Sequence, residues 1–181
     1  MRIAPLRLAG AFEIAFDPKA DARGRFTRWY DAQAFAAAGL PTAWVQANES
    51  ASRRGVVRGL HFQRPPHAET KLVRAVAGTI FDAFVDLRRG SPTYGQWDAI
   101  ELSEARQNAV LVPRGFAHGF CVVSDEALVS YLVDAVYAPH AEGGLAWDDP
   151  HLNIPWPLAS EPILSERDRG WPRLDALEPL G

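Results

Sequence analysis

Four segments of this sequence place a titratable or cationic side chain inside an otherwise apolar run. They are GVVRGLHFQ with Arg58 and His61, KLVRAV with Lys71, PRGFAHGF with His118, and ALVSYLV with Tyr131. Such a set suits proton abstraction beside a carbonyl: a histidine accepts the proton, a cation steadies the enolate oxygen, and a tyrosine returns a proton. Each residue alone is typical of a structural role, and their number within one apolar framework favours a shared polar pocket.

The elements that must position these residues follow a period of two, which is typical of β-strands. Turn residues separate the expected strands, which lie at 43–50, 55–62, 71–78, 79–87, 94–102, 108–113, 119–124 and 127–133. Helix is indicated only at 31–39, where Asp31 can cap and Gly39 can end it, and in a short segment starting at Ser165. We therefore expect one all-β domain over residues 1–181, built as a sandwich, jelly roll or closed barrel.

The strand expected at 79–87 carries two carboxylates on one face. Asp82 and Asp86 alternate with Ile80 and Phe84 there, and burying an unpaired carboxylate is costly. A solvated face would explain the pattern, but Phe84 between the carboxylates favours a polar cavity.

Other chemistries fit the residues less well. His61, Glu69 and His118 could form a three-ligand metal site, but Lys71 shares a strand face with Glu69 and would repel a dication. Cys121 lies in an apolar run, and the sequence contains neither a P-loop nor GxGxxG. We therefore expect no metal and no organic cofactor, and a bound phosphate would depend on arginines such as Arg23, Arg53, Arg54, Arg58 and Arg74.

Composition sets further limits. The chain has 181 residues, of which 48% are hydrophobic and 23% charged, and its formal net charge is −3. That charge provides no general basic surface for nucleic acid, and no run approaches the roughly 20 apolar residues that span a bilayer. The single cysteine and the lack of an apolar leader at 1–16 favour a reducing, cytoplasmic location.

Eight motifs, in order between about Asp21 and Asp168, resemble the dTDP-4-dehydrorhamnose 3,5-epimerase family. They are DARGRF, QANES, GVVRGLHFQ, KLVRAVAGTIFDAFVDLR, SPTYGQW, VPRGFAHGF, WDDPHLNIPWP and SERD. The resemblance implies a cupin-type jelly roll without metal or cofactor, acting on a nucleotide-linked 4-keto-6-deoxyhexose. It also implies a homodimer whose N-terminal strand crosses to the partner.

The resemblance implies roles for individual residues. His61 would be the base that removes the protons at C3 and C5, held by Asp168. Tyr131 would be the acid on the opposite face of the sugar, and Lys71 would stabilise the enolate oxygen. The remaining positions implied for the substrate pocket are His118 supported by Asp82, Arg58 and Arg23 for the diphosphate, Phe26 and Tyr137 for the base, and Gln46 and Asn48 for the nucleotide.

Strict alternation would point Arg58 and His61 to opposite faces, so we expect a bulge or kink at Gly59. The chain departs from the family pattern at Arg28, where a glutamate is expected near the nucleotide base, and at Leu132 and Asp134, which follow Tyr131 in place of lysine and threonine. Arg28 raises the alternative of a cytidine nucleotide, and the other two raise that of a C3-only epimerase. A cupin ketoisomerase, a non-catalytic sugar-nucleotide-binding cupin and a metal-dependent cupin are further alternatives.

Overall fold

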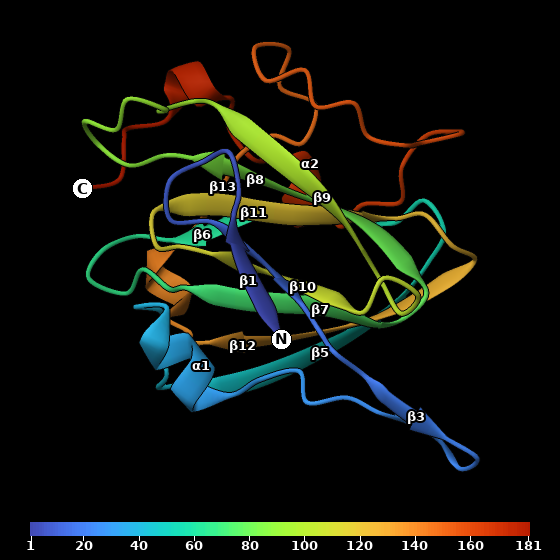
Figure 1. Ribbon diagram of the computed structural model, residues 1–181. Coiled ribbons are helices and arrows are strands. Elements are labelled where there is room, and N and C mark those ends of the chain that lie inside the picture. The colour runs from blue at the N-terminus through green and yellow to red at the C-terminus, as the bar shows by residue number, and fades with distance from the viewer.

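The computed structural model describes residues 1–181, and most of its regular secondary structure is β-strand (Figure 1). The elements are β1 (Arg2–Pro5), β2 (Phe12–Ala15), β3 (Lys19–Asp21), β4 (Gly24–Phe26), α1 (Ala32–Ala37), β5 (Gln46–Arg53), β6 (Val57–Gln63), β7 (Lys71–Ala77), β8 (Thr79–Asp86), β9 (Trp97–Ser103), β10 (Asn108–Val112), β11 (Phe116–Val122), β12 (Glu126–Val133), η1 (Pro139–Ala141), β13 (Glu142–Gly144), α2 (Glu166–Arg169) and η2 (Leu174–Ala176).

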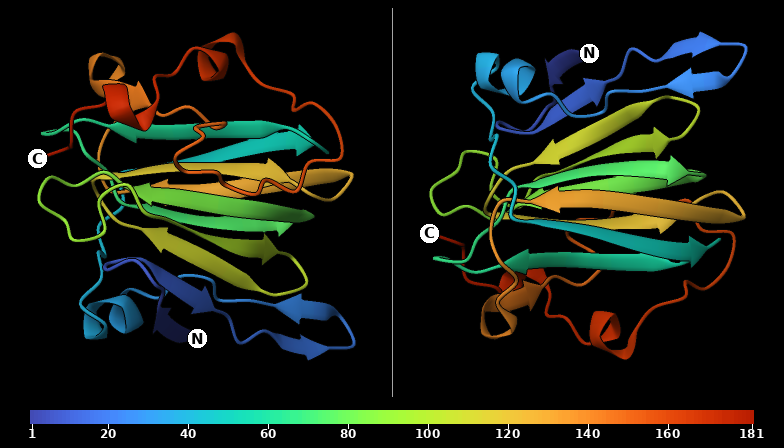
Figure 2. Two further views of the ribbon diagram at one scale, coloured as in Figure 1. Left: turned by 90° about the horizontal axis from the view of Figure 1, so that it is seen from above. Right: turned by 90° about the horizontal axis from the view of Figure 1, so that it is seen from below.

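Two antiparallel sheets pack face to face. The six-stranded sheet has the order β1-β2-β10-β7-β12-β5, and the five-stranded sheet has the order β13-β6-β11-β8-β9. Strands that are distant in sequence are therefore neighbours, as a jelly roll requires. The hairpin of β3 and β4 belongs to neither sheet and projects from the body of the molecule (Figure 2). The expected all-β jelly roll is confirmed.

Three apolar clusters hold the layers together. One lies between the sheets and joins β7, β10 and β12 to β8 and β11. A second covers the outer face of the five-stranded sheet with residues of the C-terminal segment, including Leu145, Leu152 and Leu180. A third packs Phe35 of α1 against the outer face of the six-stranded sheet. Both sheets are thus buried on two faces, so a polar group between them is either paired or in a cavity.

The two carboxylates of strand β8 are both buried, in different surroundings. Ile80 and Phe84 face the space between the sheets, whereas Ala83 and Val85 pack in the outer cluster. Asp82, which shares the inner face, is completely buried, so the solvated-face alternative is wrong. Asp86 is buried as well, but at the end of β8 it binds Arg88, Ser91 and Thr93 of the following turn instead of facing a cavity.

Both expected helices are present. Asp31 caps α1 by accepting hydrogen bonds from the backbone N–H of Gln33 and Ala34, and Ser165 caps α2. The sequence patterns missed β1 to β4 and β13, because strands of three or four residues are too short to show alternation. None of these helices has the length and hydropathy of a membrane-spanning segment.

Candidate active site

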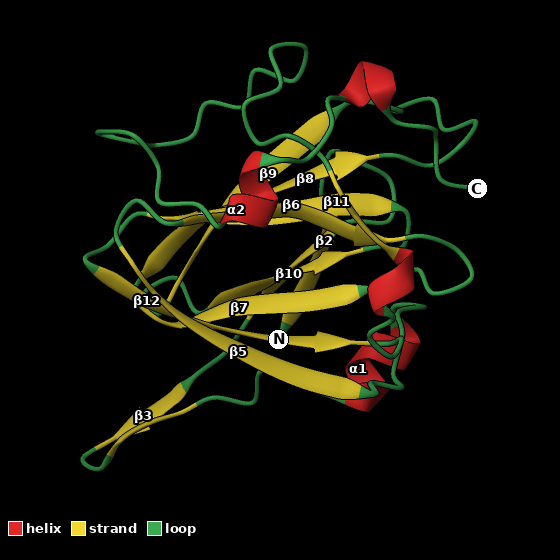
Figure 3. Ribbon diagram, turned by 180° about the vertical axis from the view of Figure 1, so that it is seen from behind, coloured by secondary structure: helices red, strands yellow, loops and turns green.

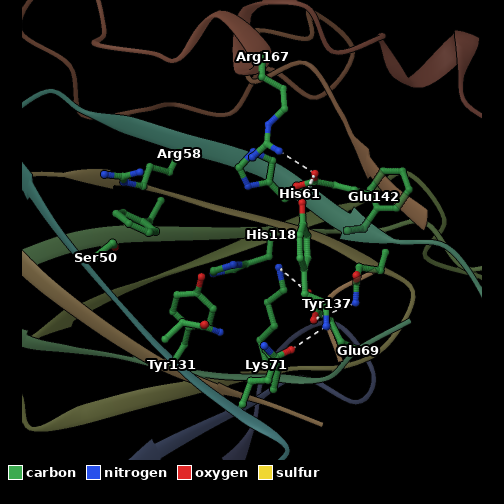
Figure 4. Close-up of a pocket in the computed structure, with 16 residues that line it drawn as sticks. Ser50, Arg58, His61, Glu69, Lys71, His118, Tyr131, Tyr137, Glu142 and Arg167 are labelled. Atoms are coloured by element: carbon green, nitrogen blue, oxygen red, sulfur yellow. Dashed lines mark hydrogen bonds and ion pairs between the residues drawn. The ribbon is translucent and has the colours of Figure 1, made fainter. Parts of the chain in front are cut away.

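A pocket of about 380 Å³ opens between the two sheets (Figure 4). Its walls come from β5, β7 and β12 on one side and from β6 and β11 on the other, with the segment after β12 and α2 at the rim. The lining residues are Gln46, Asn48, Ser50, Arg58, His61, Phe62, Gln63, Glu69, Lys71, His118, Phe120, Tyr131, Val133, Tyr137, Glu142 and Arg167. The chemistry-bearing residues of all four sequence segments therefore meet in one cavity.

Gly59 allows Arg58 and His61 of β6 to line the same pocket. The pairing of β6 with β11 shifts register here, since His61 lies opposite His118 but Arg58 lies opposite Phe120. Gly59 has φ of +128°, and a Cβ at this position would lie 2.6 Å from Cα of Gly119. The irregularity expected at Gly59 is present, and only glycine fits it.

His61 and Asp168 form a dyad at the wall of the pocket. Nε2 of His61 lies 2.6 Å from Oδ1 of Asp168, whose side chain is 5% exposed. A carboxylate can only accept a hydrogen bond, so Nε2 carries the proton and Nδ1 is the free basic nitrogen of His61. Helix α2 provides the carboxylate, and its N-cap Ser165 accepts a hydrogen bond from the backbone N–H of Asp168.

Trp171 and Gly59 complete the environment of Asp168. The indole Nε1 of Trp171 donates to Oδ1 of Asp168 at 3.3 Å, and the backbone N–H of Gly59 donates to Oδ2 at 3.4 Å. Burial alone would raise the pKa of Asp168, but the hydrogen bond and charge of His61 together with these donors bring it below the ordinary value. Asp168 is therefore a stable anion beside the imidazole. Sequence reasoning missed Trp171, which lies beyond the SERD motif.

His118 has its own carboxylate partner. Its Nε2 lies 3.0 and 2.9 Å from the two oxygens of Asp82, which is inaccessible to solvent. Burial raises the pKa of Asp82, although His118 and Lys71 lie near enough to lower it. The pairing suggested between His118 and Asp82 is thus present in the structure.

Lys71 is held by an acidic neighbour. Its Nζ lies 3.3 Å from Oε1 of Glu69, and both side chains are 12% exposed. Gln63 donates to the other oxygen of Glu69 at 3.2 Å. His61, Glu69 and His118 each have a separate partner, and no three metal-ligating side chains of the chain converge on one point.

Tyr131 faces this group from the six-stranded sheet. Burial and the negative charge of Glu69 raise the pKa of its phenol, while Arg58 acts in the opposite direction. The phenol therefore stays protonated at neutral pH and can donate. Because His61 belongs to the other sheet, the basic and the acidic group approach the cavity from opposite walls.

The rim of the pocket is polar and aromatic. Arg58 donates from Nε to Oγ of Ser52 at 3.0 Å. Glu142 accepts from the hydroxyl of Tyr137 at 2.9 Å and from Nη1 of Arg167 at 2.7 Å. Gln46 accepts from the backbone N–H of Tyr137. Sequence reasoning missed Ser50, Gln63, Glu142 and Arg167, although Arg167 precedes Asp168 within the SERD motif.

Three of the expected substrate-binding residues lie outside this pocket. Arg23 and Phe26 are on the projecting β3–β4 hairpin, where Arg23 pairs with Asp21 and Phe26 is 67% exposed (Figure 3). Arg28 pairs with Asp31 at 3.5 Å. None of these three residues lines the pocket of its own chain.

The two departures after Tyr131 have structural roles away from the cavity. Leu132 packs in the outer cluster with Phe35, on the opposite face of β12 from Tyr131. Asp134 accepts from the backbone N–H of Thr70 at 2.7 Å and pairs with Arg114 at 3.2 Å. Neither side chain lines the pocket.

Comparison with known proteins agrees with this geometry. Residues 5–176 match the family model of dTDP-4-dehydrorhamnose 3,5-epimerase. The chain is 45% identical over 166 residues to a dTDP-4-dehydrorhamnose 3,5-epimerase of Methanothermobacter thermautotrophicus, covering 91% of this chain and 89% of the relative. It is 46% identical over 170 residues to a dTDP-4-dehydrorhamnose 3-epimerase of Streptomyces niveus, covering 93% and 82%.

Among solved structures, the chain is similar to a dTDP-6-deoxy-D-glucose-3,5-epimerase of Legionella pneumophila in complex with dTDP-4-keto-L-rhamnose. The TM-score is 0.94 at 36% identity, covering 98% of this chain and 94% of that one. The family match, the curated relatives and this likeness cover nearly the whole sequence. The chain therefore belongs to the dTDP-4-dehydrorhamnose 3,5-epimerase family and is an isomerase.

Proposed function

We propose that this pocket inverts carbon centres of dTDP-4-keto-6-deoxyhexose by removing a proton beside the C4 ketone and returning one on the opposite face. The observation that carries the proposal is the placement of His61 and Tyr131 on opposite sheets across one cavity. Inversion needs a base on one side of the sugar and an acid on the other. Residues 1–181 form the catalytic domain, and the buried Cys121 fits a reducing cytoplasm.

In this proposal, Nδ1 of His61 removes the proton, while Nε2 keeps its hydrogen bond to Asp168. Asp168 fixes the imidazole and stabilises the imidazolium that forms. Negative charge then develops on the C4 oxygen, where the ammonium of Lys71 compensates for it, together with the His118–Asp82 pair. Tyr131 donates its phenolic proton to the other face of the carbanion. Solvent then returns a proton to the Tyr131 phenolate and takes one from the His61 imidazolium, so both residues are restored for the next turnover.

Substrate recognition uses the rim. The guanidinium of Arg58 binds the diphosphate, because a planar donor matches phosphate oxygens. Tyr137 stacks on the base, and Gln46 and Asn48 hydrogen-bond to the nucleotide. No observation favours a cytidine nucleotide, since Arg28 is directed to Asp31. Measured affinities for dTDP, CDP, UDP and GDP test this step, and a preference for CDP would contradict it.

The active unit is a homodimer in which the β3–β4 hairpin reaches the partner's pocket. An isolated two-stranded hairpin is marginally stable in water, and this one exposes Phe26 and Arg23, which do not line the pocket of their own chain. In a partner's pocket, Arg23 would meet the diphosphate and Phe26 the base. The hairpin thus has residues with a use only outside its own chain.

A complementation experiment tests this exchange. Arg23→Ala and His61→Ala chains are each expected to be nearly inactive, but a mixed dimer would combine one intact hairpin with one intact pocket. After unfolding and refolding at equal amounts, we expect about one quarter of the wild-type activity if chains pair at random. Refolded mixtures that show only the sum of the separate activities would contradict the exchange.

The carbons that react can be counted directly. We expect NMR of dTDP-4-keto-6-deoxyglucose turned over in heavy water to show deuterium at both C3 and C5. Deuterium at C3 alone would assign the chain to the C3-only alternative. Unchanged substrate would contradict epimerisation itself.

A further inference from the structure

A pair of histidines outside the pocket has no part in the proposed reaction. Nε2 of His67 lies 3.3 Å from Nε2 of His140, and the ring centroids are 4.9 Å apart with the planes at 88°. An end-to-end alignment of the two rings would place their centroids farther apart than this. The two rings therefore meet at an angle at their Nε2 atoms. No carboxylate lies within ion-pair distance of His67 or His140, which leaves both imidazoles free of acidic partners.

Both histidines occur in the same tetrapeptide. Pro-His-Ala-Glu spans residues 66–69, between β6 and β7, and recurs at residues 139–142, in η1 and the start of β13. In each copy the glutamate two residues after the histidine lines the pocket: Glu69 pairs with Lys71, and Glu142 binds Tyr137 and Arg167. The histidine pair therefore lies directly beside one wall of the pocket.

The backbone around the two histidines is held firmly. Buried Gln63 donates to the carbonyl of His67 at 3.0 Å and accepts from the backbone N–H of Ala138 at 2.6 Å. The backbone N–H of Arg64 donates to the carbonyl of Ala141 at 2.8 Å. These bonds tie the two turns together independently of the rings, so the imidazoles are brought close by the backbone.

We propose that His67 and His140 together bind one divalent transition-metal ion, such as Zn²⁺ or Ni²⁺, through their Nε2 atoms. Two nitrogens bound to one tetrahedral zinc at about 2.05 Å are about 3.3 Å apart, which matches their separation here. Imidazole is a preferred ligand of zinc, copper and nickel. Both side chains reach solvent, so water completes the coordination, and the ion acts as a clamp between the two turns without entering the reaction.

The clamp has a structural consequence for the pocket. Joining the two turns restrains the start of β7 and the start of β13, which carry Lys71 and Glu142. Because the ion binds the folded pair and not the unfolded chain, it stabilises the fold by mass action. Metal is thus expected to raise the melting temperature without being required for turnover.

Calorimetric titration of untagged, EDTA-treated protein with NiCl2 or ZnCl2 tests the proposal, alongside melting curves with and without metal. We expect one ion per chain and a metal-dependent rise in melting temperature. Loss of even an outer-shell partner typically weakens metal binding about 10–100-fold, so His67→Ala and His140→Ala should each weaken it at least about tenfold. His151→Ala, at an exposed histidine elsewhere, is the matched control and should bind like the wild type.

Each variant should have the wild-type melting temperature in EDTA, which separates loss of the metal site from loss of the fold. If His67→Asn and His140→Asn are also folded and fail to bind, the site is established. Equal binding by the wild type and by both single variants would overturn the proposal and place any ion elsewhere. Absence of binding to the wild type would equally overturn it, leaving the rings as an N–H···N hydrogen-bonded pair.

Discussion

Replacing Asp168 with asparagine isolates the charge behind His61, because the two side chains have the same shape. Oδ1 of Asp168 receives the two shorter contacts, from His61 at 2.6 Å and Trp171 at 3.3 Å. The amide oxygen of asparagine can take that place. Its NH2 group then faces the N–H of Gly59, which at 3.4 Å is the longest of the three contacts. The orientation of the imidazole is thereby retained while the negative charge is lost.

The expected effect can be bracketed. A hydrogen bond to a charged group contributes about 1.5–3 kcal/mol, against about 0.5–1.5 for a neutral one, so the bond alone accounts for about tenfold. The imidazolium formed during proton removal also loses its counter-ion, and a pair of charges 4 Å apart near a protein surface is worth about 4 kcal/mol. We therefore expect Asp168→Asn to lower kcat by between about 10-fold and 10³-fold, with little change in KM.

The assay is turnover of dTDP-4-keto-6-deoxyglucose followed by NMR at saturating substrate, with Asp175→Asn as the control at an exposed carboxylate of the same C-terminal segment. Melting curves establish that each variant is folded. A folded Asp168→Asn enzyme with the wild-type kcat would contradict this role of the charge, because the carboxylate would then contribute nothing beyond its shape. A large rise in KM with unchanged kcat would assign Asp168 to binding.

Three further outcomes follow from the same structure. Lys71→Met keeps the length of the side chain but removes the ammonium, and we expect kcat to fall about 10²–10³-fold, as for loss of one oxyanion donor; a wild-type rate would contradict its role. Burial and Glu69 raise the pKa of Tyr131, so the difference in ultraviolet titration between wild type and Tyr131→Phe should show a phenol that ionises above pH 10. Activity that needs the phenolic proton of Tyr131 should persist to the same pH. Ionisation of this phenol below pH 10 would contradict the raised pKa. Gly59→Ala places a Cβ within 2.6 Å of Cα of Gly119, on a residue whose φ is +128°. Chemical denaturation should therefore show a loss of about 2–5 kcal/mol in the free energy of unfolding. An unchanged free energy of unfolding would contradict the close packing of β6 and β11.

Much of the fold could be predicted because alternation is a local property. Strands β5 to β12 are each at least five residues long, which is enough to show either alternation, as in β5, or a continuous apolar run, as in β10. The short strands β1 to β4 and β13 depend on partners distant in sequence, so no local pattern indicates them. Asp82 and Asp86 illustrate the same limit: both occupy one face of β8, yet one faces His118 and the other a turn, which only the neighbouring segments determine.

The site was predictable to the extent that motifs identify single residues. His61, Lys71, His118 and Tyr131 stand out as polar residues in apolar strands, and the structure brings them together. Arg167 lies in an exposed, polar segment, where charged residues are ordinary, and Glu142 begins a strand of three residues, which is too short to show a pattern. Trp171 is recognisable as a support of Asp168 only once the packing of the C-terminal segment is known. The sequence does not show which residues pair across long sequence separations.

In the proposed mechanism His61 and Tyr131 act on opposite faces of the sugar, and solvent exchange distinguishes these two roles. Dilute enzyme is incubated with dTDP-4-keto-6-deoxyglucose in heavy water, and NMR records both deuterium content and configuration. We expect no deuterium in the sugar with His61→Asn. With Tyr131→Phe we expect deuterium with retained configuration, since His61 can return a deuteron only to the face from which it removed the proton. Exchange that persists in His61→Asn, or inversion at the wild-type rate in Tyr131→Phe, would contradict it.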